Sequence, residues 1–227
     1  MSVKIPVDRA MFGTTYETES TFEGDMLRFE AENEAPGQIV FYGPSNFTRW
    51  ATPIWGMRPL REDVVGKSGT PCVVNRGFGS SCPEHQLYYY SRIIRPLAPS
   101  VLVYCPWGNW RGFGYSAEEA WELAERVVVW TQTDFSDCRV YLHAGHWGRD
   151  LPDYGEHYAM LRFDEIQKNY ADTHKNVFFL DPKPYFEGYG RGEDTSIYSD
   201  HVHFNQKGYD MYGDYFRKAL ADELARF

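Results

Sequence analysis

The sequence lacks the features of several protein classes. Basic residues number 23 against 32 acidic ones, which leaves a net charge of −9 and no basic patch to release counterions from a phosphate backbone. No run of about 18 apolar residues occurs, and the N-terminus has no apolar stretch of the secretory type. We therefore expect a cytoplasmic protein that binds neither nucleic acid nor a membrane.

Cysteine and histidine are few, and their spacing indicates no metal site. The four cysteines form no Cys-x-x-Cys pair, and Cys72, Cys105 and Cys138 lie in or beside expected strands, where cysteine acts as a small buried hydrophobe. His143 and His146 are three residues apart, as in some zinc sites, but no third ligand clusters with them. We expect neither a metal nor a cofactor.

Short apolar runs and helical patterns alternate along the 227 residues, a length that suits one α/β domain. The expected strands are residues 38–42, 72–75, 101–104, 139–142 and 177–180. Each run is apolar without alternation, which is typical of a parallel sheet covered on both faces. The sequence therefore predicts a three-layer α/β/α domain over residues 21–227 with a five-stranded parallel sheet, preceded by a surface arm over residues 1–20.

Helical patterns fill the segments between these strands. The expected helices are residues 23–34, 50–65 with a break at Pro53, 83–96, 116–130, and one that carries Ala159, Phe163, Ile166 and Tyr170 on one face. Ser116 and Glu119 form a capping box at the start of their helix. Residues 183–199 form a glycine-rich, charged loop that is long enough to act as a lid.

The first expected strand ends at Gly43-Pro44-Ser45, which places Ser45 at the carboxyl edge of the sheet, where open α/β folds bind ligands. Taken alone, Ser45 could simply cap the next helix. The other end of the chain carries Asp200-His201-Val202-His203. A serine becomes a nucleophile when a histidine takes its proton, and a carboxylate orients that histidine. Residues three apart share one side of a tight turn, so Asp200 should reach His203 rather than His201.

These two motifs resemble those of the SGNH (GDSL-type) hydrolases, with Gly43-Pro44-Ser45 in place of Gly-Asp-Ser and Asp200-His201-Val202-His203 in place of Asp-x-x-His. The resemblance runs from about residue 25 to the C-terminus. It implies a flavodoxin-like strand order and a serine esterase in which Ser45 is the nucleophile, His203 the base and Asp200 its orienting carboxylate.

The same resemblance implies an oxyanion hole of three donors: the N–H of Ser45, a backbone N–H after the second strand, and an asparagine amide after the third. The family's Gly-Phe-Gly-Gly-Ser is here Gly77-Phe78-Gly79-Ser80-Ser81, which assigns the second donor to Ser80, with Gly79 as the fallback. A serine can serve there if its φ is negative, whereas a positive φ would cost about 1 kcal/mol or more.

The third motif departs further from the family pattern, because Gly-x-Asn-Asp becomes Trp107-Gly108-Asn109-Trp110. Counting from the preceding strand assigns the donor position to Gly108, and counting from the following helix assigns it to Asn109. We favour Asn109 because it has an amide. The alternative is that Asn109 is an ordinary turn residue.

Aromatic and basic residues gather in the loops that follow the strands. The candidates for lining a substrate pocket are Trp107, Trp110, Arg111, His143 and His146. Tryptophan faces suit sugar rings and apolar acyl groups, but many tryptophans are simply large hydrophobes. Arginine side chains in these loops can bind a substrate carboxylate or phosphate, but for most of them we favour the role of a solvated loop charge; they are Arg49, Arg76, Arg111 and Arg149.

We expect an esterase that hydrolyses small acyl esters, such as acetyl groups on sugars, through an acyl-enzyme. Its partner is then a small-molecule ester, and the oligomeric state is left open. The alternative is a binding protein for a ligand or carbohydrate, in which the altered motifs have weakened catalysis on the same scaffold. Acyl transfer to an acceptor other than water is a third possibility.

Overall fold

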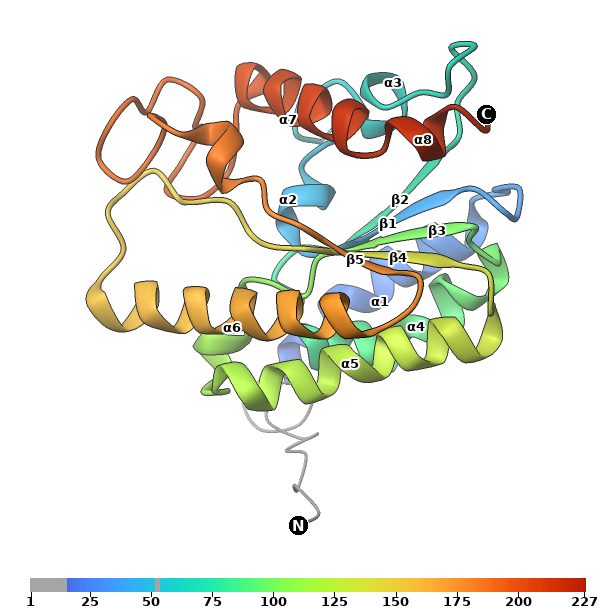
Figure 1. Ribbon diagram of the computed structural model, residues 1–227, viewed down its shortest axis with the longest axis horizontal. Coiled ribbons are helices and arrows are strands. Elements are labelled where there is room, and N and C mark those ends of the chain that lie inside the picture. Colours follow the sequence, from blue (N-terminus) through green and yellow to red (C-terminus); the bar gives the residue numbers. More distant parts are fainter. Residues whose placement is uncertain (1–15, 52–53) are drawn as a thin grey trace.

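A parallel five-stranded sheet forms the centre of the protein (Figure 1). The computed structural model describes residues 16–51 and 54–227. The strands are β1 (Ile39–Gly43), β2 (Val73–Gly77), β3 (Val101–Tyr104), β4 (Arg139–His143) and β5 (Val177–Leu180). Their order, β2-β1-β3-β4-β5, is the flavodoxin-like one. The predicted three-layer α/β/α fold is confirmed, and every expected strand lies within two residues of an observed one.

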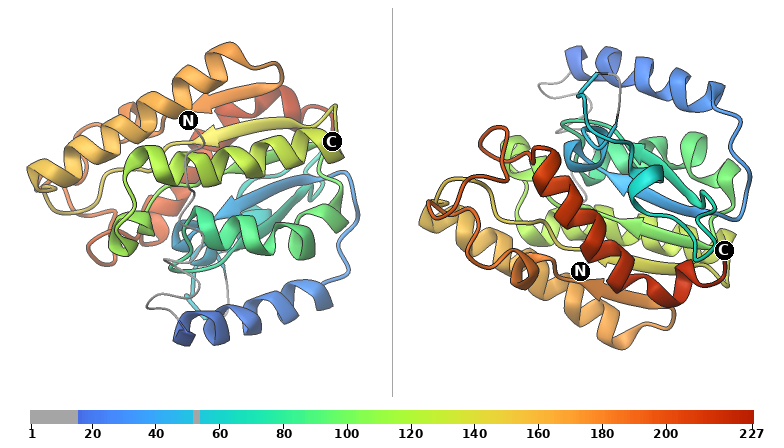
Figure 2. Two further views of the ribbon diagram at one scale, coloured as in Figure 1. Left: turned by 90° about the horizontal axis from the view of Figure 1, so that it is seen from below. Right: turned by 90° about the horizontal axis from the view of Figure 1, so that it is seen from above.

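Helices cover both faces of the sheet, as the two views of Figure 2 show. One face is covered by α1 (Tyr16–Ala31), α4 (Pro83–Ile93), α5 (Ala117–Asp134) and α6 (Tyr154–Thr173). The other is covered by α2 (Ser45–Thr48), α3 (Leu60–Asp63), α7 (Gln206–Ala219) and α8 (Ala221–Leu224). Short 3₁₀ turns complete the connections: η2 (Arg95–Leu97), η3 (Asn109–Phe113) and η4 (Lys183–Phe186). Strands buried on both faces explain why the expected runs were apolar without alternation.

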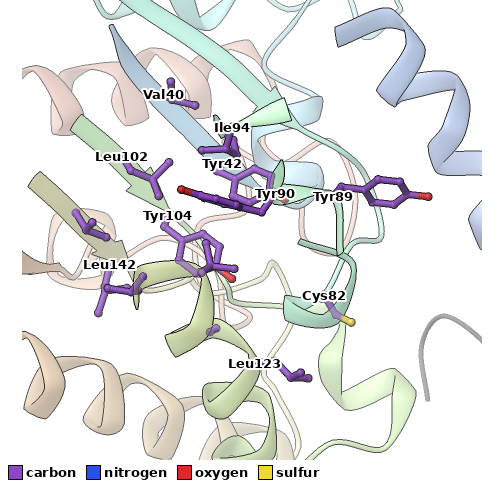
Figure 3. Close-up of a cluster of buried hydrophobic side chains, with 14 of the residues drawn as sticks. Val40, Tyr42, Cys82, Tyr89, Tyr90, Ile94, Leu102, Tyr104, Leu123 and Leu142 are labelled. Carbon is purple, nitrogen blue, oxygen red and sulfur yellow. The ribbon is translucent and has the colours of Figure 1, made fainter. Parts of the chain in front are cut away.

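The layer between the sheet and α1, α4 and α5 is rich in tyrosine (Figure 3). The rings of Tyr42 and Tyr104 stack with centroids 5.7 Å apart across adjacent strands. Tyr42 donates its buried hydroxyl to the backbone oxygen of Gln86 on α4. A tyrosine ring fills the layer like any apolar side chain, and pairing its hydroxyl avoids the cost of a buried unpaired group. This contact ties β1, which carries the following turn, to the helix behind it.

The expected helix over residues 50–65 is wrong. Within this range the chain instead forms irregular connections and the four-residue α3, and Pro53 lies in the part outside the described residues. Pro59 cannot continue a helix, and Gly56 has a φ of +68°, which breaks helical geometry. Trp50 is fully buried against α7 and donates its indole N–H to Asp63 at 2.6 Å. Tertiary packing therefore determines the path of this segment.

The ends of the other helices follow local signals. The capping box at Ser116 and Glu119 is present at the start of α5. Helix α1 begins at Tyr16, so residues 16–20 of the expected surface arm are helical, whereas residues 1–15 lie outside the described part. All four cysteines are buried and free, which confirms the burial predicted for Cys72, Cys105 and Cys138. Within the described residues, no helix combines the length and apolarity needed to cross a bilayer.

Candidate active site

Ser45 is the first residue of α2, directly after β1 reaches the carboxyl edge of the sheet. Close packing against α2 requires glycine at the last position of β1 and at the last position of β2. A methyl group on Gly43 would lie 2.9 Å from Cβ of Cys105, and one on Gly77 would lie 2.5 Å from the backbone N of Thr48. The two glycines let β1 and β2 end against α2. Ser45 is thereby held at the N-terminus of a short helix, and in the part of the chain that the structure describes its N–H donates to no other group.

The loop before α7 brings His203 to Ser45 across 158 residues of sequence. Nε2 of His203 lies 2.8 Å from Oγ of Ser45. Nδ1 of His203 lies 2.9 Å from both carboxylate oxygens of Asp200. His201 points away to solvent, where it contacts Asp150 at 2.5 Å. The predicted preference of Asp200 for His203 over His201 matches this geometry.

The surroundings of His203 and Asp200 favour a neutral imidazole beside a charged carboxylate. Burial lowers the pKa of His203 below 6.5, and it outweighs the hydrogen bond to Asp200, which raises that pKa. Burial also raises the pKa of Asp200, but the backbone N–H groups of Val202 and His203 and the imidazole of His203 donate to this carboxylate and lower its pKa below the ordinary value. A neutral imidazole is the form that can accept a proton from Ser45.

The turn after β2 supplies backbone donors beside Ser45. Ser80 has a φ of +63°, a conformation that costs a residue with a side chain about 1 kcal/mol or more. This is the strained case anticipated for Ser80. A methyl group built on Gly79 would lie 3.9 Å from Cβ of Ser45, so Gly79 borders the nucleophile. Within the described chain, the N–H groups of Gly79 and Ser80 donate to no other group. Gly79, the fallback, therefore has the better geometric support.

Asn109 begins η3 and lies over the same turn. Its Nδ2 donates one hydrogen bond to the backbone oxygen of Ser81 at 3.0 Å, and the amide has a second hydrogen. The preceding Gly108 has a φ of +117°, which only glycine adopts readily, and a methyl group there would lie 3.8 Å from Pro44. The third motif is thus held against the other two, with the amide of Asn109 beside the turn after β2.

Two expected pocket residues lie in the core instead. Trp110 is 1% exposed and packs on Phe163 of α6 with ring centroids 5.2 Å apart. His143 is fully buried, and its Nε2 shares a hydrogen bond with the hydroxyl of Tyr212 at 3.1 Å. Burial lowers the pKa of His143 well below its ordinary value, so this ring is a neutral packing group. The assignment of Trp110 and His143 to substrate contact is therefore corrected.

The remaining three candidates occupy different positions. His146 is 2% exposed, stacks on Phe204 with ring centroids 4.0 Å apart and donates Nδ1–H to the backbone oxygen of Trp147, so it supports the His203 loop from behind. Burial lowers the pKa of His146 to about 4. Arg111 pairs with Glu156 on α6 at 3.1 Å. Trp107 is half-buried between the two core layers, next to Gly108.

The expected lid is tied down by backbone hydrogen bonds. The N–H of Arg191 donates to Gly148 at 3.0 Å, and the N–H of Gly192 donates to Arg149 at 2.8 Å. The N–H of Arg149 in turn donates to His201 at 2.7 Å. The loops after β4 and β5 therefore brace the loop that carries His203.

The sequence did not indicate two contacts at the site. The guanidinium of Arg49 donates to Oδ2 of Asp200 at 2.6 Å. Gly145 lies flat against the indole of Trp107, where any side chain would overlap the ring. Both contacts join segments far apart in the chain, so no local pattern could have indicated them. Among the described residues, histidine, cysteine and carboxylate side chains form no group of three that could hold a metal ion.

No protein-family model matches the sequence, and no curated protein matches it. Solved structures match over most of the chain. A GDSL-like lipase from Bacteroides thetaiotaomicron is 14% identical, with a TM-score of 0.63 over 90% of this chain and 97% of that one. An acetyl xylan esterase is 19% identical, with a TM-score of 0.67 over 80% and 98%. A catalytic mutant of an acetylxylan esterase from Geobacillus stearothermophilus is 14% identical, with a TM-score of 0.62 over 82% and 95%. At these identities the similarity is one of fold.

Proposed function

We propose that this protein, whose fold is that of the SGNH (GDSL-type) hydrolases, is a serine esterase that hydrolyses small acyl esters through an acyl-enzyme. The observation that carries the proposal is the hydrogen-bonded series Ser45–His203–Asp200, with contacts of 2.8 and 2.9 Å. A serine, an imidazole and a carboxylate in this order form an activated nucleophile on any fold.

The reaction follows from these contacts. Nε2 of His203 accepts the proton of Ser45 as Oγ attacks the ester carbonyl, and Asp200 stabilises the resulting imidazolium. The carbonyl oxygen becomes negative and faces the N–H groups of Ser45 and Gly79 and the amide of Asn109. The C–O bond to the leaving group then breaks, and His203 donates its proton to the departing alkoxide. Water repeats the sequence on the acyl-enzyme and releases the acid.

We expect the acyl group to be short. The turn after β2 lies close to the nucleophile, since a methyl group built on Gly79 would be only 3.9 Å from Cβ of Ser45. Two of the structures with this fold are described as acetyl xylan esterases, which supports an acetyl group on a sugar as the candidate substrate.

The intact geometry favours an enzyme over a binding protein on the same scaffold. A binding protein has no need for a neutral histidine within hydrogen-bond distance of both a serine and a carboxylate. The altered third motif still presents an amide at Asn109, and the altered second motif still presents backbone N–H groups. The departures from the family pattern therefore leave each donor type in place.

A series of p-nitrophenyl esters tests the proposal. We expect turnover of the acetate, a kcat/KM that falls as the acyl chain lengthens to octanoate, and a loss of about 1000-fold or more in Ser45→Ala. A spontaneous or contaminating activity would persist in Ser45→Ala. Absence of turnover in the folded parent across acetylated sugars and aryl esters would favour the binding protein.

A further inference from the structure

Arg49 joins the nucleophile to the carboxylate that orients the base. It is the C-cap of α2, and its backbone N–H donates to the backbone oxygen of Ser45 at 2.9 Å. Its Nη1 donates to Oδ2 of Asp200 at 2.6 Å. We propose that Arg49 is a positioning residue that fixes Asp200, and through it His203, relative to Ser45. This inference rests on the proposed esterase function and assigns an additional residue to the same site.

The carboxylate of Asp200 is held from two directions. Oδ1 accepts the backbone N–H groups of Val202 at 3.0 Å and of His203 at 2.9 Å, which come from its own loop. Oδ2 accepts the guanidinium of Arg49, which comes from the helix of the nucleophile. The side chain of Asp200 is 38% exposed, so without Arg49 the hydrogen bond that Oδ2 shares with Nδ1 of His203 would be the contact left to hold this oxygen, and the carboxylate would be fixed mainly through Oδ1. A single helix therefore fixes both ends of the series.

The guanidinium is itself held in place. Its carbon lies 4.4 Å from the ring centroid of Trp55, and the side chain is 24% exposed. A cation between an aromatic face and a carboxylate loses less freedom on pairing than a solvated arginine does. The arrangement differs from an ordinary surface ion pair, whose contribution is small.

The charge of Arg49 also acts on the imidazole. The charged and titratable groups that face His203 are Asp200 from its own loop, Arg49 from α2, and His146 from the loop after β4, with Tyr209 on α7 behind them. Asp200 favours the imidazolium, and Arg49 opposes it, so the pKa of His203 is lower than burial and Asp200 alone would make it. The neutral base then persists to lower pH.

Neutral substitutions test this role without relying on turnover. The imidazole of His203 is titrated by NMR in the parent, Arg49→Gln, Arg49→Met and Arg49→Lys, with His203→Gln used to assign the signal. Removal of the positive charge should raise the midpoint by about 0.5–1 pH unit in Arg49→Gln and Arg49→Met, with recovery to within about 0.3 unit in Arg49→Lys. Loss of the hold on Asp200 should also weaken the hydrogen bond that Nδ1–H of His203 donates, so that the signal of this proton moves upfield and the proton exchanges faster with water in the neutral variants but not in Arg49→Lys. At pH 8, kcat should fall about tenfold in the neutral variants with little change in KM.

The matched control is Arg95→Gln. Arg95 also pairs with a carboxylate, Asp134 at 2.7 Å, and lies over an aromatic ring, Tyr90 at 5.6 Å, but it precedes β3 and therefore sits at the opposite edge of the sheet. Its removal changes the net charge equally and should move the midpoint of His203 by less than about 0.2 unit.

The outcomes separate this proposal from the proposed function. An Nδ1–H signal of His203 that keeps the chemical shift and exchange rate of the parent in folded Arg49→Gln and Arg49→Met would show that Asp200 still holds the imidazole, and would overturn the role of Arg49 whether or not the parent is an esterase. Unfolding of both neutral variants beside a folded Arg49→Lys would assign Arg49 to stability alone and would overturn it as well. A weakened Nδ1–H hydrogen bond in the neutral variants of a protein that cleaves no ester would leave the positioning intact and reject the esterase.

Discussion

Gly145 offers a sharp test of how the loop after β4 supports the site. A methyl group at this position would overlap Cδ2, Cε2 and Cε3 of the Trp107 indole, well inside the 3.0 Å that real Cβ contacts respect. The ring would have to retreat by about 1 Å or more, yet it is packed between both core layers. Trp107 also precedes Gly108 and Asn109, so a shift of the ring would displace the proposed oxyanion donor.

We expect Gly145→Ala to destabilise the protein by about 3 kcal/mol, near the upper end of the usual cost of overpacking because the ring has nowhere to move. For a chain of this length, that corresponds to a fall in Tm of roughly 6–12 °C, measured by thermal denaturation. The control is Gly112→Ala in η3, where nothing lies within 4 Å and φ is not positive; its effect should stay within about 1 kcal/mol.

A double-mutant cycle identifies the cause. If the indole is the obstacle, Gly145→Ala should cost less than about 0.5 kcal/mol when Trp107 is already alanine. An equal cost in both backgrounds would refute the reasoning, because the damage would then come from the backbone at Gly145 and not from the contact with the ring.

Three further predictions concern the chemistry. Ser45→Ala and His203→Ala should each abolish ester turnover, and the double variant should lose little more, whereas His201→Ala should keep it; the reverse pattern for the two histidines would discredit the assignment. The pH profile of kcat/KM should lose activity as pH falls, with a midpoint below 6.5 because burial lowers the pKa of His203 and only the neutral imidazole accepts a proton; a midpoint above 7 would contradict this. Asn109→Ala should lower kcat about 100-fold with little change in KM, and full activity would move the donor elsewhere.

The sheet could be predicted from the sequence because its central strands β1, β3 and β4 are buried on both faces. Runs such as Val101–Tyr104 must then be apolar at every position, which is a local signal. The spacing of Asp200 and His203 was equally informative, since a tight turn places residues three apart on one side. The predicted ends of the strands were less accurate where the apolar run stops, as at β2, which continues beyond Asn75 to Arg76 and Gly77.

Side-chain destinations in the loops could not be predicted. His143 is the last residue of β4, and the aromatic residues of α7 that bury it lie about seventy positions away. Trp110 follows Asn109 directly, but the 3₁₀ turn directs the indole into the core. A sequence pattern can place aromatic residues near the carboxyl edge of the sheet, but it does not indicate whether each ring turns into the core or toward the site.

The sequence also did not indicate backbone strain or contacts between residues far apart in the chain. Nothing in the sequence distinguishes the left-handed φ of Ser80 from an ordinary serine turn, so the choice between Ser80 and Gly79 needed the structure. Arg49 and Asp200 are 151 residues apart, and their contact depends on how α2 and the loop before α7 meet. The sequence identified both residue sets but not this connection between them.

The central claim is that Ser45 is an activated nucleophile, and a serine-directed organophosphonate tests it most directly. The reagent should add once to the folded parent, and peptide mapping should locate the adduct on Ser45, because only an activated hydroxyl attacks phosphorus. The rate of addition should fall by about 1000-fold or more in His203→Ala, which removes the base. An unmodified intact mass of the folded parent, or an adduct on any other serine, would contradict the account.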